Sequence, residues 1–359
     1  MTVISDLTDT IPGLVPASSL DPTERAPDRP LISDSESWDA IQTVATCFRH
    51  TGWQTLRHRI YRALIRTGQP ENRILAFTDC GSRAYVCRHR TDTERYAVLG
   101  SGCRDRFCIP CQKSRSRVIG QNVTQYLAGG PVRFITLTLR HNHTTLAEQL
   151  TRLIAAFTRL RQRKFWKRHV VGGAAFLEVT LSVTEEWHPH LHVLAHGKYI
   201  PYAVLRSEWL AVTGDSYITD VRCAKSDAEV VAYVAKYASK PFSGFISRSP
   251  PHLDELIHAM HGRRTIVAFG TWRSLKATFE EPTGDWEYLC TLDELVYHAR
   301  ARQAEWMAIL MAVAPHRAQA MLERIGDETT RAPPDVPDLQ AEQFLLFADT
   351  DTPDFYANQ

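Results

Sequence analysis

The feature that most constrains this chain is a pair of histidines one residue apart within the segment 187–194. Side chains alternate between the two faces of a β-strand, so His190 and His192 point the same way while Leu191 turns toward a core. Two imidazoles on one face can share a divalent cation. The alternative is a pair of packed histidines, but two on one face beside His188 favour a metal site.

Glu178 is the best candidate for a third ligand. It lies in a predicted strand over 174–183, which a polar turn at 184–187 joins to the histidine strand. A hairpin that pairs residue 178 with residue 192 puts the carboxylate on the histidine face. Nitrogen ligands alone suit zinc, whereas an added carboxylate makes the site compatible with Mg²⁺ or Mn²⁺.

A predicted helix over 226–239 carries Tyr233 and Tyr237, which are four residues apart and so lie on one face. A tyrosine is a weak nucleophile at its free pKa of about 10, and a metal on the phosphate oxygens would help it attack a phosphodiester. Lys236 and Lys240 are placed to stabilise the charge of the transition state. The alternative is that both tyrosines simply pack against a sheet.

Five of the eight cysteines cluster. Thiolates suit tetrahedral zinc, and Cys108-x-x-Cys111 has the spacing of a turn that grips one ion. Cys103 would be a third ligand, and Cys80 or, alternatively, Cys87 a fourth. A closed set of four thiolates would make this a structural zinc site. The alternative is a group of reduced cysteines with no metal.

The charge of the chain is distributed unevenly. The formal net charge is +2, but residues 1–36 carry −5 and the residues after Arg331 carry −6, which leaves +13 on residues 37–331. A basic middle is expected of a chain that approaches phosphates. Arg104 and Arg106 flank the cysteines, and we expect them to contact DNA together with Lys240, although a scaffolding role is the alternative.

No apolar run is long enough to span a bilayer, and the N-terminus lacks the basic and hydrophobic regions of a secretory signal. We therefore expect a cytoplasmic protein that does not bind a membrane. Apolar periodicity predicts helices over 38–68, 116–127 and 146–170, and alternation predicts a strand over 132–140. The expected fold class is α+β, with a central antiparallel sheet.

The predicted domain organisation has five parts. Residues 1–36 form a disordered lead, 37–127 a helical and cysteine-rich zinc-binding region, and 128–245 the catalytic core. Residues 246–331 form a mostly helical C-terminal region, and 332–359 an acidic, disordered tail.

Three ordered motifs resemble those of the HUH endonucleases, in particular the rolling-circle replication initiators of small plasmids and phages. The threonine-rich strand 134–138 is similar to the first motif of that family, 188–194 to its metal motif, and 233–240 to its nucleophile motif. The cysteine region at 79–111 looks like the one that precedes these motifs in plasmid initiators. The resemblance covers roughly residues 75–245, and the order of the motifs is more specific than any one of them.

The resemblance implies a fold and a reaction. The fold is an antiparallel sheet with helices on one face, the histidines on a middle strand and the tyrosine helix packed across it. The reaction is metal-dependent nicking and joining of single-stranded origin DNA through a 5′-phosphotyrosine, which leaves a 3′-hydroxyl primer. Many plasmid initiators carry a glutamate where this chain has Tyr233; the Tyr233–Tyr237 pair is similar instead to phage initiators and some transposases, which implies that the two tyrosines alternate.

The function expected from this resemblance is that of a plasmid replication initiator. A two-tyrosine single-strand transposase is the first alternative, and a zinc-containing DNA-binding regulator is the second. An initiator would work with a host helicase and polymerase. The sequence leaves the origin sequence, the preferred metal and the oligomeric state open.

Overall fold

A computed structural model describes residues 38, 42–127, 130–140, 142–182, 184–239, 242, 244–275, 286–314, 318 and 344–347. Lys240, the predicted lead at 1–36 and most of the predicted tail lie outside the described residues. Among the described residues, none of the helices combines the length and the apolar character that a bilayer crossing requires.

The chain forms two compact units, and each is assembled from separated segments. The first unit comprises 1–51, 78–102 and 281–351, and the second comprises 52–77, 103–280 and 352–359. The predicted domain ranges were contiguous, whereas these units are not, because strands far apart in the sequence pair within each of them.

The second unit is built on a five-stranded sheet with the order β6-β3-β5-β4-β7. All four neighbouring pairs of strands are antiparallel. The strands are β3 (Val132–Thr138), β4 (Val170–Leu181), β5 (Trp187–Gly197), β6 (Thr219–Cys223) and β7 (Ile266–Gly270). The histidine strand β5 is therefore the central strand, as the resemblance implied.

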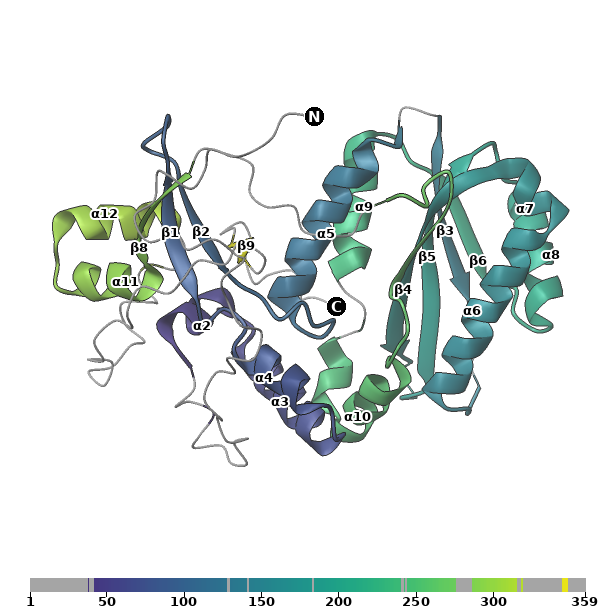
Figure 1. Cartoon of the computed structure of the whole chain (residues 1–359). Coiled ribbons are helices and arrows are strands. Elements are labelled where there is room, and N and C mark those ends of the chain that lie inside the picture. The colour runs from purple at the N-terminus through teal and green to yellow at the C-terminus, as the bar shows by residue number, and fades with distance from the viewer. Residues whose placement is uncertain are drawn as a thin grey trace, which may run out of the picture. The chain divides into compact units, whose positions relative to one another are not determined.

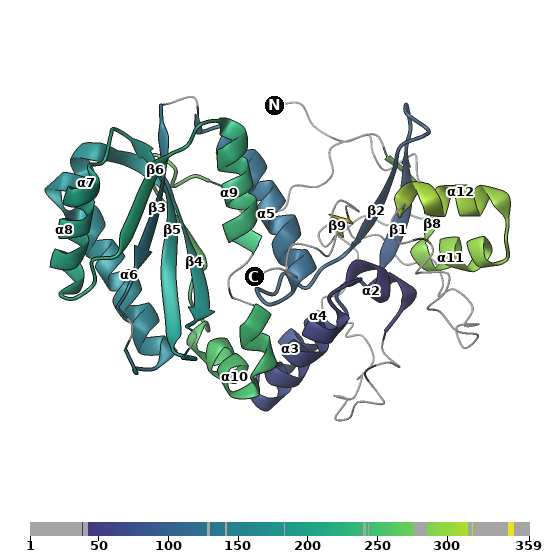
Figure 2. The same ribbon diagram turned by 180° about the vertical axis from the view of Figure 1, so that it is seen from behind.

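The expected α+β class with a central antiparallel sheet is confirmed, but helices cover both faces of this sheet and not only one. The helices α5 (Ile109–Thr124) and α9 (Asp227–Ser239) lie on one face, and α6 (Leu146–Gln162), α7 (Lys164–His169) and α8 (Tyr202–Thr213) lie on the other (Figures 1 and 2). The physical reason is visible in β5, where the side chains from Pro189 to His196 are buried on both faces. A strand buried on both faces needs a layer of helices on each.

Two predicted helices are each split in two. The predicted helix 38–68 breaks between α2 (Val44–Arg49) and α3 (Gln54–Arg66), where Gly52 has a φ of +81°. The predicted helix 146–170 breaks at Arg163, whose extended backbone separates α6 from α7.

Within the second unit, α3 packs on α10 (Pro250–Ala259), and the Arg66 guanidinium donates two hydrogen bonds to Asp254 at 2.9 and 2.8 Å. The helix α4 (Glu71–Thr78) follows α3.

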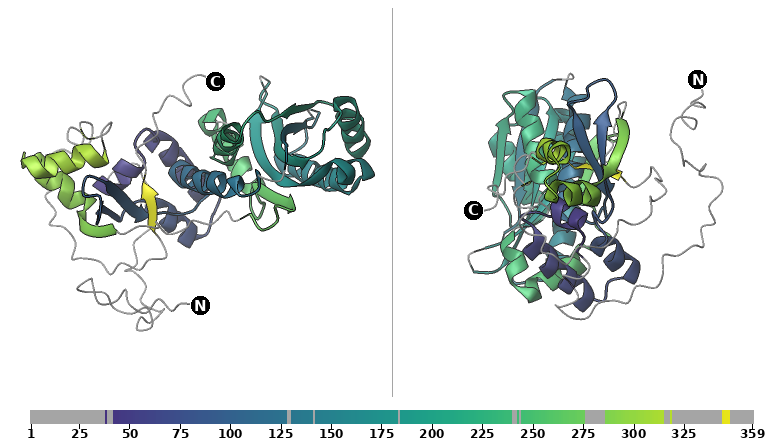
Figure 3. Two further views of the ribbon diagram at one scale, coloured as in Figure 1. Left: turned by 90° about the horizontal axis from the view of Figure 1, so that it is seen from above. Right: turned by 90° about the vertical axis from the view of Figure 1, so that its left-hand side faces the viewer.

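The first unit contains a four-stranded sheet with the order β8-β1-β2-β9. Its strands are β1 (Ala84–His89), β2 (Tyr96–Ser101), β8 (Trp286–Thr291) and β9 (Phe344–Phe347). The helices α11 (Leu292–Arg300) and α12 (Ala304–Val313), yellow-green in Figure 3, pack on β1 and β2, and α2 packs on α11.

Two regional expectations need correction. Residues 246–331, predicted to be mostly helical, also contain β7 and β8, which extend the two sheets. The tail predicted to be disordered contains β9, because the apolar run 344–347 pairs with β2 in antiparallel register. A short 3₁₀ helix, η2 (Gly244–Arg248), precedes α10.

Candidate metal and tyrosine site

Glu178, His190 and His192 meet on one face of the central hairpin of the second unit. The Nε2 atoms of both imidazoles lie 2.9 Å from the same carboxylate oxygen, Oε2 of Glu178. Glu178 pairs with His190 and not with His192, so the expected register is shifted by two residues. Because side chains repeat their face every two residues, this shift leaves the carboxylate on the histidine face.

The hydrogen bonds around His190 show why this group fits a cation. Its Nδ1 lies 3.2 Å from the backbone carbonyl of His188. A carbonyl can only accept, so this nitrogen carries a proton, and in a neutral ring Nε2 then presents a lone pair toward Glu178. A lone pair facing a carboxylate oxygen is repulsive unless a positive charge lies with them. A proton on Nε2 supplies that charge when the imidazole donates to Glu178, and a metal ion supplies it for all three side chains at once, whose ligand atoms lie within 4.8 Å of one another.

Burial and hydrogen bonding oppose each other in this group. Burial alone would raise the pKa of Glu178, but its hydrogen bonds to His190 and His192 outweigh that effect and hold the pKa well below the usual range. Burial lowers the pKa of His192, which the hydrogen bond to Glu178 only partly offsets. An ionised carboxylate and a neutral imidazole are the forms in which these side chains bind metals.

The helix α9 brings both predicted tyrosines onto His192. The rings of Tyr237 and His192 are stacked, with centroids 3.5 Å apart and an interplanar angle of 22°. The hydroxyl of Tyr233 lies 3.2 Å from Nδ1 of His192. The structure thus brings together the predicted metal ligands and the predicted nucleophiles, which lie about forty residues apart in the sequence.

The two tyrosines differ in their surroundings. Tyr233 is buried, with 7% of its surface exposed, and its ring stacks on Phe134 with centroids 4.2 Å apart. Burial, with a smaller contribution from the neighbouring Tyr237, raises the pKa of Tyr233. Tyr237 is only half-buried. Of the two hydroxyls, that of Tyr237 belongs to the more accessible side chain.

Lys236 also lies beside the site, with its Nζ 5.1 Å from the centroid of the Tyr237 ring. Its positive charge contributes to the lowered pKa of His192, after burial and the charge of His190. Lys240, the other predicted lysine, is outside the described residues.

One site residue was missed from the sequence. The Oγ1 of Thr136 lies 3.4 Å from Nδ1 of His192, the same nitrogen that Tyr233 approaches. Thr136 pairs with His192 across β3 and β5. The signal was the threonine within the strand 134–138, but its use required knowing that β3 is the neighbour of β5 and in which register.

Three of the predicted zinc ligands lie together in the second unit. The sulfur atoms of Cys103, Cys108 and Cys111 are within 4.8 Å of one another. Cys108 is the N-cap of α5, and Cys111 lies in its first turn. The positive end of a helix dipole favours thiolates at both positions. Cys80 is buried in the first unit, between α4 and β1.

The alternative ligand Cys87 lies within β1 and is in none of the metal-suited groups among the described residues. Burial raises the pKa of its thiol to about 11. A neutral thiol is a poor zinc ligand. Cys87 therefore behaves as a packed core residue.

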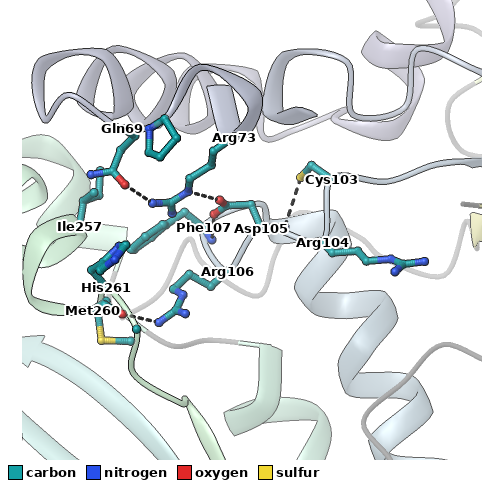
Figure 4. Close-up of a pocket in the computed structure, with 12 residues that line it drawn as sticks. Gln69, Arg73, Cys103, Arg104, Asp105, Arg106, Phe107, Ile257, Met260 and His261 are labelled. Atoms are coloured by element: carbon teal, nitrogen blue, oxygen red, sulfur yellow. Dashed lines mark hydrogen bonds and ion pairs between the residues drawn. The ribbon is translucent and has the colours of Figure 1, made fainter. Parts of the chain in front are cut away.

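The two arginines beside the cysteines have different surroundings. The Arg106 guanidinium is partly buried and donates to the backbone carbonyls of Met260 and Arg263, at 2.6 and 2.7 Å, near the end of α10. One of the two arginines predicted to contact DNA, Arg106, is thus engaged with the protein's own backbone. Arg104 is exposed, and its side chain points away from Arg106 (Figure 4).

Arg106 also lines an open pocket of about 360 Å³ within the second unit (Figure 4). A second arginine in this pocket, Arg73, is paired with Asp105 at 2.7 Å and with Gln69 at 2.5 Å. Arg73 and Arg106 thus join α4, the turn at 103–108 that carries two of the cysteines, and the end of α10. Both arginines are therefore engaged in holding this turn in place.

Fold and site together define a protein that holds a Glu-His-His group on the central strands of an antiparallel sheet, beneath a helix bearing two tyrosines. A family model described as Replication protein matches residues 98–310, which include the three clustered cysteines and the whole of this site. The match spans more than half of the 359 residues, and the chain belongs to this family of replication proteins. Searches of curated proteins and of solved structures found no match.

Proposed function

We propose that the protein initiates the rolling-circle replication of a plasmid by nicking single-stranded origin DNA through Tyr237. The observation that carries the proposal is the stacking of the Tyr237 ring on His192, one of three side chains whose ligand atoms converge on one point. Membership of a replication protein family supports this use of the site. A nucleophile and a metal group in contact are what a phosphodiester transesterification needs.

The residues would divide the reaction between them. Glu178, His190 and His192 would hold Mg²⁺ or Mn²⁺, and the bound ion would neutralise charge on the phosphate oxygens. The Tyr237 oxygen attacks phosphorus as its proton leaves. The bond to the 3′ oxygen breaks, and that oxygen takes up a proton. Lys236 lies close enough to the ring of Tyr237 to stabilise the negative charge that develops there.

The products explain how such a nick would start replication. The 5′ end stays on the enzyme as a phosphotyrosine, which keeps the energy of the phosphodiester bond for the later joining step. The free 3′-hydroxyl serves as a primer for a host polymerase, and a host helicase would separate the strands. Exposed Arg104, together with Lys240, would contribute positive charge toward the DNA backbone.

The proposal is tested by searching for the covalent adduct in the full-length protein. Overlapping single-stranded oligonucleotides covering both strands of the replicon that carries the gene are incubated with protein and Mn²⁺. We expect one sequence to give a protein–DNA adduct on a denaturing gel, and mass spectrometry to place the nucleotide on Tyr237. EDTA should abolish the adduct. Cleavage without an adduct, or an adduct on a residue other than Tyr237, would refute the proposed mechanism.

We propose in addition that Cys80 joins Cys103, Cys108 and Cys111 in a closed, structural zinc site. Three clustered thiols, two of them at the N-terminus of α5, form an incomplete tetrahedral set, and one further thiolate closes it. Such a site would hold the start of α5, which packs against α9. The zinc would thereby support the helix that carries the tyrosines.

Loss of this zinc should destabilise the protein strongly. Structural zinc contributes on the order of 10 kcal/mol, comparable with the whole free energy of unfolding of a domain. We expect Cys108→Ser to reduce the zinc content from one ion per chain to none and to lower the thermal midpoint by at least about 10 °C. The measurements are elemental analysis and thermal unfolding.

The matched control is Cys223→Ser, at an exposed cysteine on β6. It should retain both the zinc and the midpoint. If Cys108→Ser kept one zinc per chain, the cysteine site would be ruled out.

A further inference from the structure

We infer that Tyr233 is a positioning residue that fixes the proton on Nδ1 of His192, and is not a second nucleophile that alternates with Tyr237. This inference rests on the proposed function of His192 as a metal ligand. It assigns the two tyrosines different roles, whereas the sequence predicts the same role, that of a nucleophile, for both.

The surroundings of the His192 ring point to this role. Its Nε2 faces Glu178, and its Nδ1 faces two hydroxyls, those of Tyr233 at 3.2 Å and Thr136 at 3.4 Å. An imidazole that gives its Nε2 lone pair to a metal must carry its proton on Nδ1 and needs an oxygen to accept that proton. Tyr233 and Thr136 supply such oxygens.

The comparison with His190 shows what these hydroxyls add. A backbone carbonyl faces Nδ1 of His190, and because a carbonyl can only accept, it fixes the tautomer by itself. A single hydroxyl does not fix the tautomer of His192 in this way, because it can either donate to Nδ1 or accept from it. Two hydroxyls on one nitrogen compensate for this, since an Nδ1–H then finds an acceptor over a wider range of directions.

The packing of Tyr233 argues against an attack on DNA. Its ring stacks on Phe134 at an interplanar angle of 21°, and only 7% of its surface is exposed. Phe134 and Thr136 are two residues apart on β3, so the same face of that strand holds both the ring of Tyr233 and the second hydroxyl. To reach a phosphate, the Tyr233 hydroxyl would have to leave His192 and unpack from β3.

The test compares Tyr233→Phe, Thr136→Val and the double variant in the full-length protein. We expect each single change to weaken Mn²⁺ binding about 3- to 10-fold, as the loss of one hydrogen bond predicts. The double variant should lose about 10- to 100-fold, the usual effect of removing the outer partner of a metal ligand. Binding is measured by electron paramagnetic resonance of free Mn²⁺.

A second measurement reads the proton itself. In protein labelled with ¹⁵N-histidine and saturated with Mg²⁺, nitrogen chemical shifts should show the His192 proton on Nδ1 in the wild type. In the double variant we expect a mixture of tautomers. The matched control is Tyr126→Phe, because the Tyr126 hydroxyl bonds Ser274 at 2.9 Å and its ring packs on the same core cluster. It should change neither readout.

The outcomes separate this inference from the proposed function. If the wild type binds neither Mn²⁺ nor Mg²⁺ at this site, the proposed function fails together with the inference. If the wild type binds Mn²⁺ and the double variant binds it equally well with the same tautomer, the positioning role alone is refuted. An adduct formed by Tyr237→Phe and mapped to Tyr233 would also overturn it.

Discussion

Tyr237→Phe is expected to abolish the covalent protein–DNA adduct and to reduce strand cleavage below detection. The change removes one oxygen and leaves the ring that stacks on His192, so the metal group should remain intact. No other group can replace an attacking atom that is missing, because covalent catalysis depends on that atom. The measurement is adduct formation on the cleaved origin strand in the presence of Mn²⁺.

The matched control is Tyr202→Phe, which removes a hydroxyl from a half-exposed tyrosine at the start of α8, on the other face of the sheet. It should form the adduct at the wild-type rate. Mn²⁺ affinity should be unchanged in both variants. If Tyr237→Phe still formed half as much adduct as the wild type, Tyr237 could not be the principal nucleophile.

The metal ligands could be predicted from the sequence because they depend on the face of a strand and not on its register. The expected pairing of residue 178 with residue 192 is off by two residues, yet Glu178 still faces both histidines. Similarly, the spacing of four between Tyr233 and Tyr237 places both on one side of α9 in any packing. Local periodicity was sufficient for each of these expectations.

The different environments of the two tyrosines could not be predicted in this way. Tyr233 is buried because Phe134 stacks on it, and Phe134 lies about one hundred residues earlier in the chain. Which segments form the first unit could not be predicted for the same reason, since β1 pairs with β8, about two hundred residues later in the sequence. The second layer of helices also depends on such distant contacts.

The breaks within the predicted helices have a local cause that apolar periodicity does not report. The apolar residues of α6 repeat at helical spacing up to Leu160, and nothing in that pattern marks the extended backbone of Arg163 that separates α6 from α7. Gly52 does mark the break between α2 and α3 in the sequence, because a glycine readily adopts the positive φ found there.

Glu178→Gln is expected to lower the Mn²⁺-dependent nicking rate about 10³-fold, which corresponds to roughly 4 kcal/mol of lost transition-state stabilisation. Glutamine has nearly the same shape, but it removes the negative charge at the point where both Nε2 atoms converge. Its amide can also turn a donor toward those nitrogens, which competes with a metal. Mn²⁺ affinity should fall in parallel, while the zinc content stays at one ion per chain.

The control for this change is Glu185→Gln, an exposed carboxylate in the turn of the same hairpin. It changes the net charge equally but lies outside the Glu-His-His group, so it should nick at the wild-type rate. The comparison separates a ligand from the general electrostatic effect of removing one acidic residue near DNA, which would raise affinity for the strand in both variants. Equal nicking rates in Glu178→Gln and Glu185→Gln would mean that the cation is not held by Glu178, and the metal-assisted mechanism would have to be abandoned.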